Sequence, residues 1–236
     1  MRAVDLHAPE GEQALGELLG RYLSALKTHL TQARKLTPDY ADDIVQGFVM
    51  DKILRGQLLA HANESRGRFR TFLLTALDRY MFNQFRRDLA RRRAPEGGPP
   101  IPLDGIQDLV GVPPASPFFD MAWIREIIDE TLRRVKQDCN SVHRRRYWTL
   151  FEDRIVNPLL TGQEARPYRR LVSELGFSSP MQASNALVTV KRMFIRIFRD
   201  VVREYANDEQ SVDREIEELC AILSEHSVYQ QGRGPR

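Results

Sequence analysis

The sequence is poor in cysteine: its 236 residues include two, Cys139 and Cys220. Two thiols cannot form the disulfide framework that stabilises small secreted proteins, and they suit a reducing compartment. The apolar runs are far shorter than the roughly 20 residues that span a bilayer. The first residues lack the apolar run and cleavage site of a secretory signal. We therefore expect a cytoplasmic protein with no membrane anchor.

Strand patterns and catalytic groupings are also lacking. No segment alternates apolar and polar residues with the two-residue period of a strand. The five histidines are scattered without metal-ligand spacing, and no glycine-rich phosphate loop is present. We therefore expect an all-α protein that is not an enzyme and has no catalytic residues, metal or cofactor.

Apolar residues that recur every three or four positions predict helices along most of the chain. Thr37-Pro38 and Ser116-Pro117 each read as an N-cap followed by a first-turn proline. Asn157-Pro158 predicts a break between helices. The predicted helices cover residues 15–30, 37–54, 66–93, 116–135, 143–155, 168–175, 180–205 and 212–223.

Composition changes sharply at Ala94. The stretch APEGGPPIPLDGIQDLVGVPPASP is dense in proline and glycine and offers few apolar groups. Such a segment is longer than most loops inside compact domains and is typical of a flexible linker. The sequence therefore predicts two helical domains and a helical extension. Their expected bounds are 10–93 for the first domain, 94–116 for the linker, 117–207 for the second domain and 208–226 for the extension.

The segment RGRFRTFLLTALDRYMFNQFRRDLARRR, residues 66–93, combines an apolar stripe with a basic surface. Five of its last eight residues are arginine. Arginines, an asparagine and aromatic rings on one helix suit a surface that holds phosphates and stacks on bases. A solvated basic helix end before a linker remains the alternative. The stripe consists of Phe69, Phe72, Leu73, Ala76, Leu77, Tyr80 and Phe85.

A helix-turn-helix pattern follows in the second predicted domain. A short amphipathic helix over 168–175 precedes Gly176-Phe177-Ser178-Ser179, and Pro180 opens a longer helix. This arrangement is what a DNA-binding module needs, although many helical hairpins share it.

These features, in this order, resemble the extracytoplasmic-function (ECF) class of bacterial RNA polymerase sigma factors over residues 14–225. YADDIVQGF is similar to the motif of the second helix of the sigma-two domain. GRFRTFLLTALDRYMFNQFRR is similar to the promoter-melting and −10-reading segment, and YRRLVSELGFSS to the start of the sigma-four helix-turn-helix. The resemblance implies a sigma-two-like domain at 10–93 and a sigma-four-like domain at 117–207. It implies core RNA polymerase and promoter DNA as partners, with an anti-sigma factor or a serine/threonine kinase as further candidates.

By this resemblance, an acidic edge of the second helix would dock on core polymerase. Tyr40 and Gly47 stand where the family usually has acidic residues, so we expect weakened docking. A favourable arrangement of acids at a helix start is the alternative explanation. The expected core-binding residues are Asp42, Asp43, Gln46 and Asp51.

The resemblance also implies that the 61–68 loop and the following helix capture a flipped base and contact the −10 element. Phe72 occupies the position of an aromatic wedge but could equally belong to the core. Arg79 stands where the family often has an asparagine that contacts the extruded base. The expected −10 residues are Asn63, Ser65, Arg66, Arg68, Phe72, Arg79, Asn83, Arg86 and Arg87.

The expected recognition helix has no basic residue in its first three turns, PMQASNALVTV. Its amides and hydroxyls can read base edges, but most of the usual electrostatic affinity is missing. Either this helix contacts the −35 element only weakly, or part of its surface binds protein instead of DNA. The expected −35 residues are Gln182, Ser184, Asn185, Lys191 and Arg192.

The sequence thus predicts an ECF-type sigma factor that recruits core polymerase and opens promoters. Two alternatives remain. One is a helix-turn-helix transcriptional regulator whose first domain dimerises. The other is a sigma-like adaptor without promoter activity, which the apolar recognition helix favours.

Overall fold

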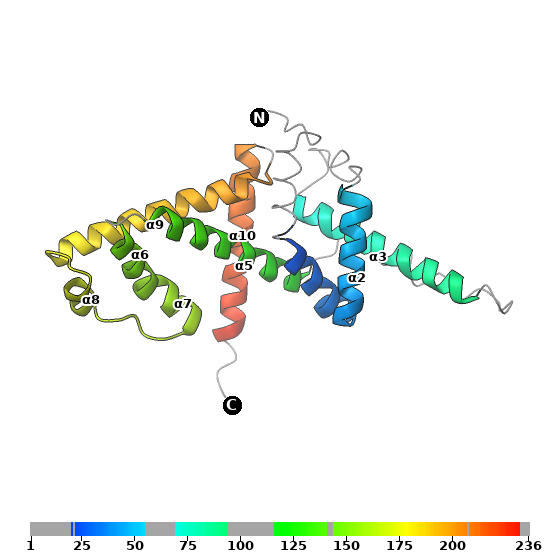
Figure 1. The fold of residues 1–236 in the computed structure, drawn as a ribbon, viewed down its shortest axis with the longest axis horizontal. Coiled ribbons are helices and arrows are strands. Elements are labelled where there is room, and N and C mark those ends of the chain that lie inside the picture. The colour runs from blue at the N-terminus through cyan, green and yellow to red at the C-terminus, as the bar shows by residue number, and fades with distance from the viewer. Residues whose placement is uncertain are drawn as a thin grey trace. The chain divides into compact units, whose positions relative to one another are not determined.

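The computed structural model describes residues 20, 22–54, 69–93, 116–140, 144–206 and 208–231. Every regular element in these ranges is helical, so the all-α class is confirmed (Figure 1). No helix in this part of the chain is long and apolar enough to cross a membrane. The expected linker lies outside the described residues, apart from Ser116.

The chain forms two compact units. Unit 1 comprises 1–124, 205–207 and 219–236, and unit 2 comprises 125–204 and 208–218. The division falls inside the helix α5 (Pro117–Asp138), after the domain start that the sequence predicts at residue 117. The predicted domain bounds stay a prediction.

In unit 1, the described elements are a helix at 22–28, the π-helical turn η1 (His29–Ala33), α2 (Pro38–Phe48), the π-helical turn η2 (Val49–Leu54), α3 (Phe69–Arg93), the first turns of α5 and the later turns of α10 (Glu209–Gln231). In unit 2, they are the rest of α5, α6 (Arg145–Phe151), the π-helical turn η5 (Glu152–Val156), α7 (Asn157–Thr161), α8 (Tyr168–Glu174), α9 (Pro180–Arg203) and the first turns of α10.

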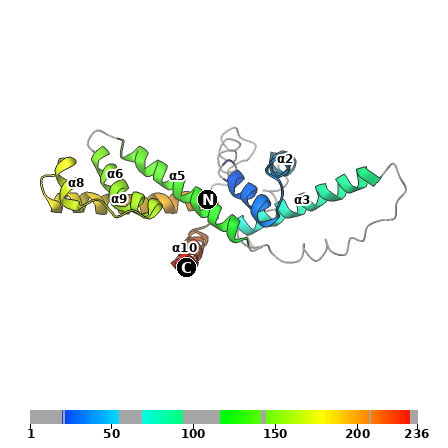
Figure 2. The same cartoon turned by 90° about the horizontal axis from the view of Figure 1, so that it is seen from below.

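The core of unit 1 lies where α2 packs against α3, and the C-terminal end of α3 extends past α2 (Figures 1 and 2). The predicted stripe of α3 is confirmed at Leu73, Leu77 and Tyr80, which are buried. Phe72, Ala76 and Phe85 are half-buried, and the sequence missed the buried Leu74 and Met81. The side chain of Phe69, also part of the predicted stripe, lies outside the described residues.

An aromatic group completes this core. The Tyr22 ring stacks on Trp123 with 3.5 Å between ring centroids, and the Tyr205 ring meets both edge-on. Stacked and edge-to-face rings are worth about 0.5–1.5 kcal/mol beyond the area that they bury. The group joins the helix at 22–28 to the first turns of α5.

Three helices begin as the sequence predicts. The hydroxyls of Thr37, Ser116 and Ser179 accept from backbone N–H groups three residues later, at 3.4, 3.3 and 3.2 Å. In each case a proline follows the capping residue, where its missing N–H leaves no helical bond unmade. These starts are confirmed because capping needs only a few neighbouring residues.

The predicted break at Asn157-Pro158 is wrong. The chain stays helical from α6 through η5 and α7 to Thr161, and it ends at Gly162 in the left-handed conformation (φ +69°). Pro158 occupies a first-turn position of α7, directly after η5. A π-helical turn widens the backbone before the proline, which accommodates its ring and its missing donor.

Unit 1 contains a buried polar network that the scattered positions of the histidines in the sequence do not predict. His29 is 1% exposed. Its Nδ1 lies 2.9 Å from Ser116 Oγ, and its Nε2 lies 3.0 Å from Asp78 Oδ1. The Arg34 Nε also donates to Asp78 Oδ1 at 3.0 Å. The network ties η1, α3 and the start of α5 together.

His29 and Arg34 stabilise the ionised form of the Asp78 carboxyl. Burial by itself would raise the pKa of this carboxyl, but hydrogen bonds from His29 and Arg34 outweigh burial and hold the pKa below its ordinary value. Asp78 therefore stabilises the fold in its ionised form.

We predict that Asp78→Asn lowers the free energy of unfolding by about 3 kcal/mol at neutral pH, because it leaves a buried charge network incomplete. Since the folded pKa is lowered, this contribution is full above the ordinary value of 3.8 and falls as pH drops toward the folded value. Urea unfolding at pH 7 and pH 3 measures both effects. Asp88→Asn, on the same helix, is the control and should cost less. An equal difference between wild type and Asp78→Asn at both pH values would contradict this account.

Candidate nucleic-acid interface

The outer face of α3 carries an exposed basic row. Arg79, Asn83 and Arg86 follow one another at intervals of four and three residues, so they share one face of the helix. Arg87 lies beside them, and all four side chains are exposed. Among the described residues, none of these arginines has a carboxylate partner. The row therefore presents uncompensated positive charge and one amide.

The side of α3 that packs on α2 and η2 is fixed by two tyrosine hydroxyls. The Tyr80 hydroxyl donates to Asp51 at 3.1 Å, and the Tyr40 hydroxyl donates to Asp88 at 3.2 Å. The Tyr40 ring packs on Phe85, with 5.5 Å between ring centroids. Burial raises the pKa of Tyr80, and the Asp51 carboxylate adds to this effect, so the hydroxyl remains a donor at neutral pH. These two links set the face that α3 turns outward.

Gly47 has a packing role in this arrangement. A Cβ at this position would lie 2.5 Å from the Tyr80 hydroxyl oxygen, closer than such atoms approach. The bare backbone of α2 thus lets the Tyr80 side chain cross over it and reach Asp51. Tyr40 and Gly47, where the YADDIVQGF segment departs from the motif that it resembles, both serve the packing of α2 on α3.

The expected core-binding residues do not form one free edge. Asp43 and Gln46 are exposed, whereas Asp42 and Asp51 are half-buried. The Lys27 ammonium donates to Asp42 Oδ2 at 2.7 Å, and Asp51 accepts from Tyr80. Asp43 and Gln46 are therefore the members of this set most available to a partner.

Four of the expected −10 residues, Asn63, Ser65, Arg66 and Arg68, lie outside the described residues. Phe72 is half-buried on α3, which agrees with neither a fully buried core residue nor a fully exposed wedge.

In unit 2, α8 and α9 form the predicted helix-turn-helix around a small apolar core (Figure 1). Gly176 adopts the left-handed conformation (φ +67°), which glycine reaches without a Cβ penalty. The Phe177 ring is thereby turned inward, and its N–H donates to the Val172 carbonyl at 3.0 Å. The core consists of Leu150, Leu171, Phe177, Ala183 and Ala186.

Arg146 of α6 braces the turn from outside. Its Nη1 donates to the Gly176 carbonyl at 2.9 Å, and its guanidinium lies 4.7 Å from the centroid of the Phe177 ring. A cation over an aromatic face is attractive, and here the same side chain also satisfies a turn carbonyl. The turn is thus held by α6 as well as by its own glycine.

The outer face of α9 mixes polar and apolar side chains. Ser184, Asn185, Lys191 and Arg192 are all exposed, as the sequence led us to expect of a DNA-reading surface. Between them lie three exposed apolar residues spaced by seven, so they share the same face. These are Met181, Val188 and Ile195, which are 71%, 42% and 60% exposed.

Gln182 serves the helix start. Its Oε1 accepts from the Ser178 backbone N–H at 2.8 Å and from the Ser178 hydroxyl at 3.0 Å. Reading adenine requires the amide oxygen and the amide N–H₂ group of a glutamine together. Because its oxygen is engaged in the turn, Gln182 cannot make this contact unless the cap opens. Asn185, the other amide among the expected −35 residues, is exposed.

Acidic partners offset much of the positive charge of α9. Arg196 pairs with Asp138 at 3.3 Å, Arg199 with Asp213 at 2.6 Å, and Arg203 with Glu209 at 2.7 Å. Glu209 and Asp213 belong to the start of α10. Among the described residues, Lys191 and Arg192 have no carboxylate partner. The cations available on α9 are therefore the two that the sequence singled out.

Comparisons of the chain with protein-family models, curated proteins and solved structures find no match. The sequence patterns and the geometry described above therefore carry the functional argument.

We predict that the effect of Gly47→Ala depends on the Tyr80 hydroxyl. Alanine favours a helix over glycine by about 0.5–1 kcal/mol, but overpacking against the hydroxyl costs about 1–3 kcal/mol. Gly47→Ala should therefore destabilise the wild-type protein. In a Tyr80→Phe background the 2.5 Å clash is gone, and the same change should stabilise. Chemical unfolding of wild type, the two single variants and the double variant measures the coupling free energy between the two residues. Additive changes in the free energy of unfolding would show that the two side chains do not meet as described.

Proposed function

We propose that this protein is an ECF-type sigma factor, a non-enzymatic subunit that recruits core RNA polymerase and directs it to promoters. One observation carries the proposal. The chain combines an exposed arginine row on α3 with a capped helix-turn-helix, α8–α9, in the order that the sequence resemblance predicts. Two separate DNA-binding surfaces in this order suit a factor that contacts two promoter elements.

In this proposal, the row of Arg79, Asn83, Arg86 and Arg87 holds phosphates and bases of the −10 strand. Asn185, Lys191 and Arg192 contact the −35 element from α9. The domains would be a sigma-two-like domain at 10–93 and a sigma-four-like domain at 117–207, joined by a flexible linker. The partners are core polymerase and promoter DNA, in the cytoplasm, with an anti-sigma factor or a serine/threonine kinase as the candidate regulator.

A sigma-like adaptor without promoter activity is the second candidate. The exposed Met181, Val188 and Ile195 favour it, because three apolar side chains on one face suit contact with a protein. An adaptor and a sigma factor would both bind core polymerase. Synthesis of short abortive RNAs on a template already melted at −10 separates them, since only the sigma factor supports it.

We predict that docking on core polymerase depends on the exposed part of the α2 edge. Asp43→Lys combined with Gln46→Lys should weaken binding to purified core enzyme at least about tenfold, because it reverses the charge of an edge that, by the resemblance, docks through its acidic side chains. Neither side chain is buried, so the fold should be retained. Asp129→Lys, an exposed charge reversal on α5, is the matched control.

The outcomes of this binding experiment decide between the candidates. A wild-type chain that fails to bind core polymerase but binds a specific duplex would be a helix-turn-helix regulator. A double variant that binds core as well as wild type does would show that the docking surface lies elsewhere.

We predict that the −10 element contributes more to promoter selection than the −35 element. Replacing Arg86 and Arg87 by Ala should weaken open-complex formation and reduce its salt slope by about 1–2, since each lost phosphate contact removes roughly 0.7–0.9. Asn185→Ala should cost at most about 1–3 kcal/mol, and only at −35 positions. Transcription from promoters altered separately in each element is the measurement. A greater loss from −35 changes would refute the predicted balance.

A further inference from the structure

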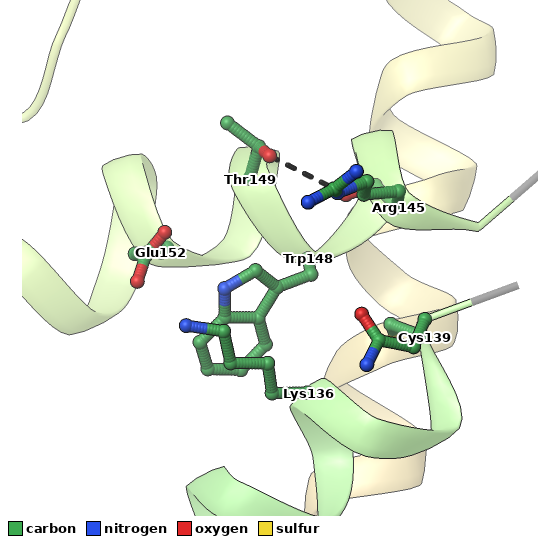
Figure 3. Close-up of a pocket in the computed structure, with 7 residues that line it drawn as sticks. Lys136, Cys139, Arg145, Trp148, Thr149 and Glu152 are labelled. Atoms are coloured by element: carbon green, nitrogen blue, oxygen red, sulfur yellow. Dashed lines mark hydrogen bonds between the residues drawn. The ribbon is translucent and has the colours of Figure 1, made fainter. Parts of the chain in front are cut away.

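A pocket of about 220 Å³ lies in unit 2, between the C-terminal end of α5 and the start of α6 (Figure 3). Trp148 lines it and is 8% exposed. The indole Nε1 is buried and has no hydrogen-bond partner. Figure 3 shows this nitrogen on the side where the Lys136 ammonium and the Glu152 carboxylate lie. A buried donor without a partner is uncommon in a native structure, and a bound ligand is one way to satisfy it.

Two positive groups line the same pocket. The Lys136 ammonium lies 5.6 Å from the centroid of the Trp148 ring, and the Arg145 guanidinium belongs to the same lining. Among the described residues, neither cation has a carboxylate partner. Asn140 adds an amide to the lining. The lining of the pocket therefore carries two cations and an amide, which are groups that can hold an oxyanion.

The thiol in the lining does not oppose an anion. Burial raises the pKa of Cys139, and the nearby Asp138 charge adds to the effect, so the thiol is neutral at physiological pH. Its Sγ donates to the Met193 sulfur at 3.9 Å. Cys139 therefore contributes a neutral wall.

Glu152 restricts the kind of ligand. Its half-buried carboxylate lines the same pocket, and among the described residues its side chain has no partner. A simple anion would be repelled by this charge, whereas a ligand with its own cationic donor would be attracted. The volume is below the roughly 300–1,000 Å³ of pockets for drug-sized molecules, so the ligand must be small.

We propose that this pocket binds a small amino carboxylate, a molecule of the size and charge pattern of a free amino acid. Its carboxylate accepts from Lys136, Arg145 and the Trp148 indole, and its ammonium group donates to Glu152. The site is independent of the sigma-factor proposal, since it requires no polymerase or DNA.

Such a ligand would act on the helix-turn-helix through α6. This helix carries Trp148 in the pocket and Leu150 in the helix-turn-helix core, and its Arg146 braces the Gly176 turn. A ligand that joins the end of α5 to the start of α6 would fix the position of all three residues. Ligand binding would therefore fix the geometry of the helix-turn-helix, and control of DNA binding by a small molecule rests on the proposed function.

The test compares L-aspartate with succinate, which has the same carbon skeleton without the amine. Calorimetry and tryptophan fluorescence on the full chain, at constant ionic strength, measure both affinities. L-Aspartate should bind with a Kd near or below about 1 mM, and succinate at least about tenfold more weakly. Because the chain has two tryptophans, the fluorescence change should disappear in Trp148→Phe.

Variants of exposed lining residues test the assignment without threatening the fold. Lys136→Gln and Arg145→Gln should each weaken L-aspartate binding about tenfold or more. Arg133→Gln, an exposed change on α5 outside the pocket, should leave it unchanged. Absence of binding at millimolar concentration, equal affinity for succinate, or unchanged affinity in both lining variants would each overturn the proposal.

Discussion

A single buried carboxylate, Asp78, is the constraint on which the described part of unit 1 depends. It accepts from His29 and Arg34, and His29 in turn bonds to the Ser116 hydroxyl that caps α5. A charge in a low-dielectric interior is costly unless each of its lone pairs has a partner. The network therefore fixes η1, α3 and the start of α5 to one another, since displacement of any of them would leave the Asp78 charge or the His29 ring without a partner.

Two hydrogen bonds from tyrosine hydroxyls to carboxylates fix another side of α3 in the same way. Tyr40 and Tyr80 connect α2 and η2 to α3 through Asp88 and Asp51, and Gly47 makes room for one of them. Their effect is to direct the arginine row outward. The same links engage Asp51, an acid that the resemblance assigns to polymerase docking. Packing and the proposed docking thus compete for the same acidic side chain, and Asp43 and Gln46 remain for a partner.

Unit 2 combines a well-formed helix-turn-helix with a weakly charged outer face of α9, the proposed recognition surface. Capping engages Gln182, and acids of α5 and α10 neutralise the later arginines of α9. Phosphate contacts supply most of the affinity of proteins for DNA, so a surface with two free cations suits a secondary contact. The proposed ligand pocket lies on α6, the helix that also braces the turn, which would make this modest contact adjustable.

The sequence by itself determined the all-α class, the N-caps at Thr37 and Ser116 and the helix start at Pro180, because periodicity and capping are local properties. It also located the helix-turn-helix and the exposed arginines of α3. Tertiary structure alone decided which polar groups are buried together: His29 meets Asp78 and Ser116 across 49 and 87 residues of sequence. Tertiary structure also decided that the helix continues through Pro158, because a π-helical turn before it accommodates the proline ring. It decided as well that Gly47 leaves room for the Tyr80 side chain. These contacts form between residues that packing brings together, and their distances cannot be predicted from the spacing of residues in the sequence.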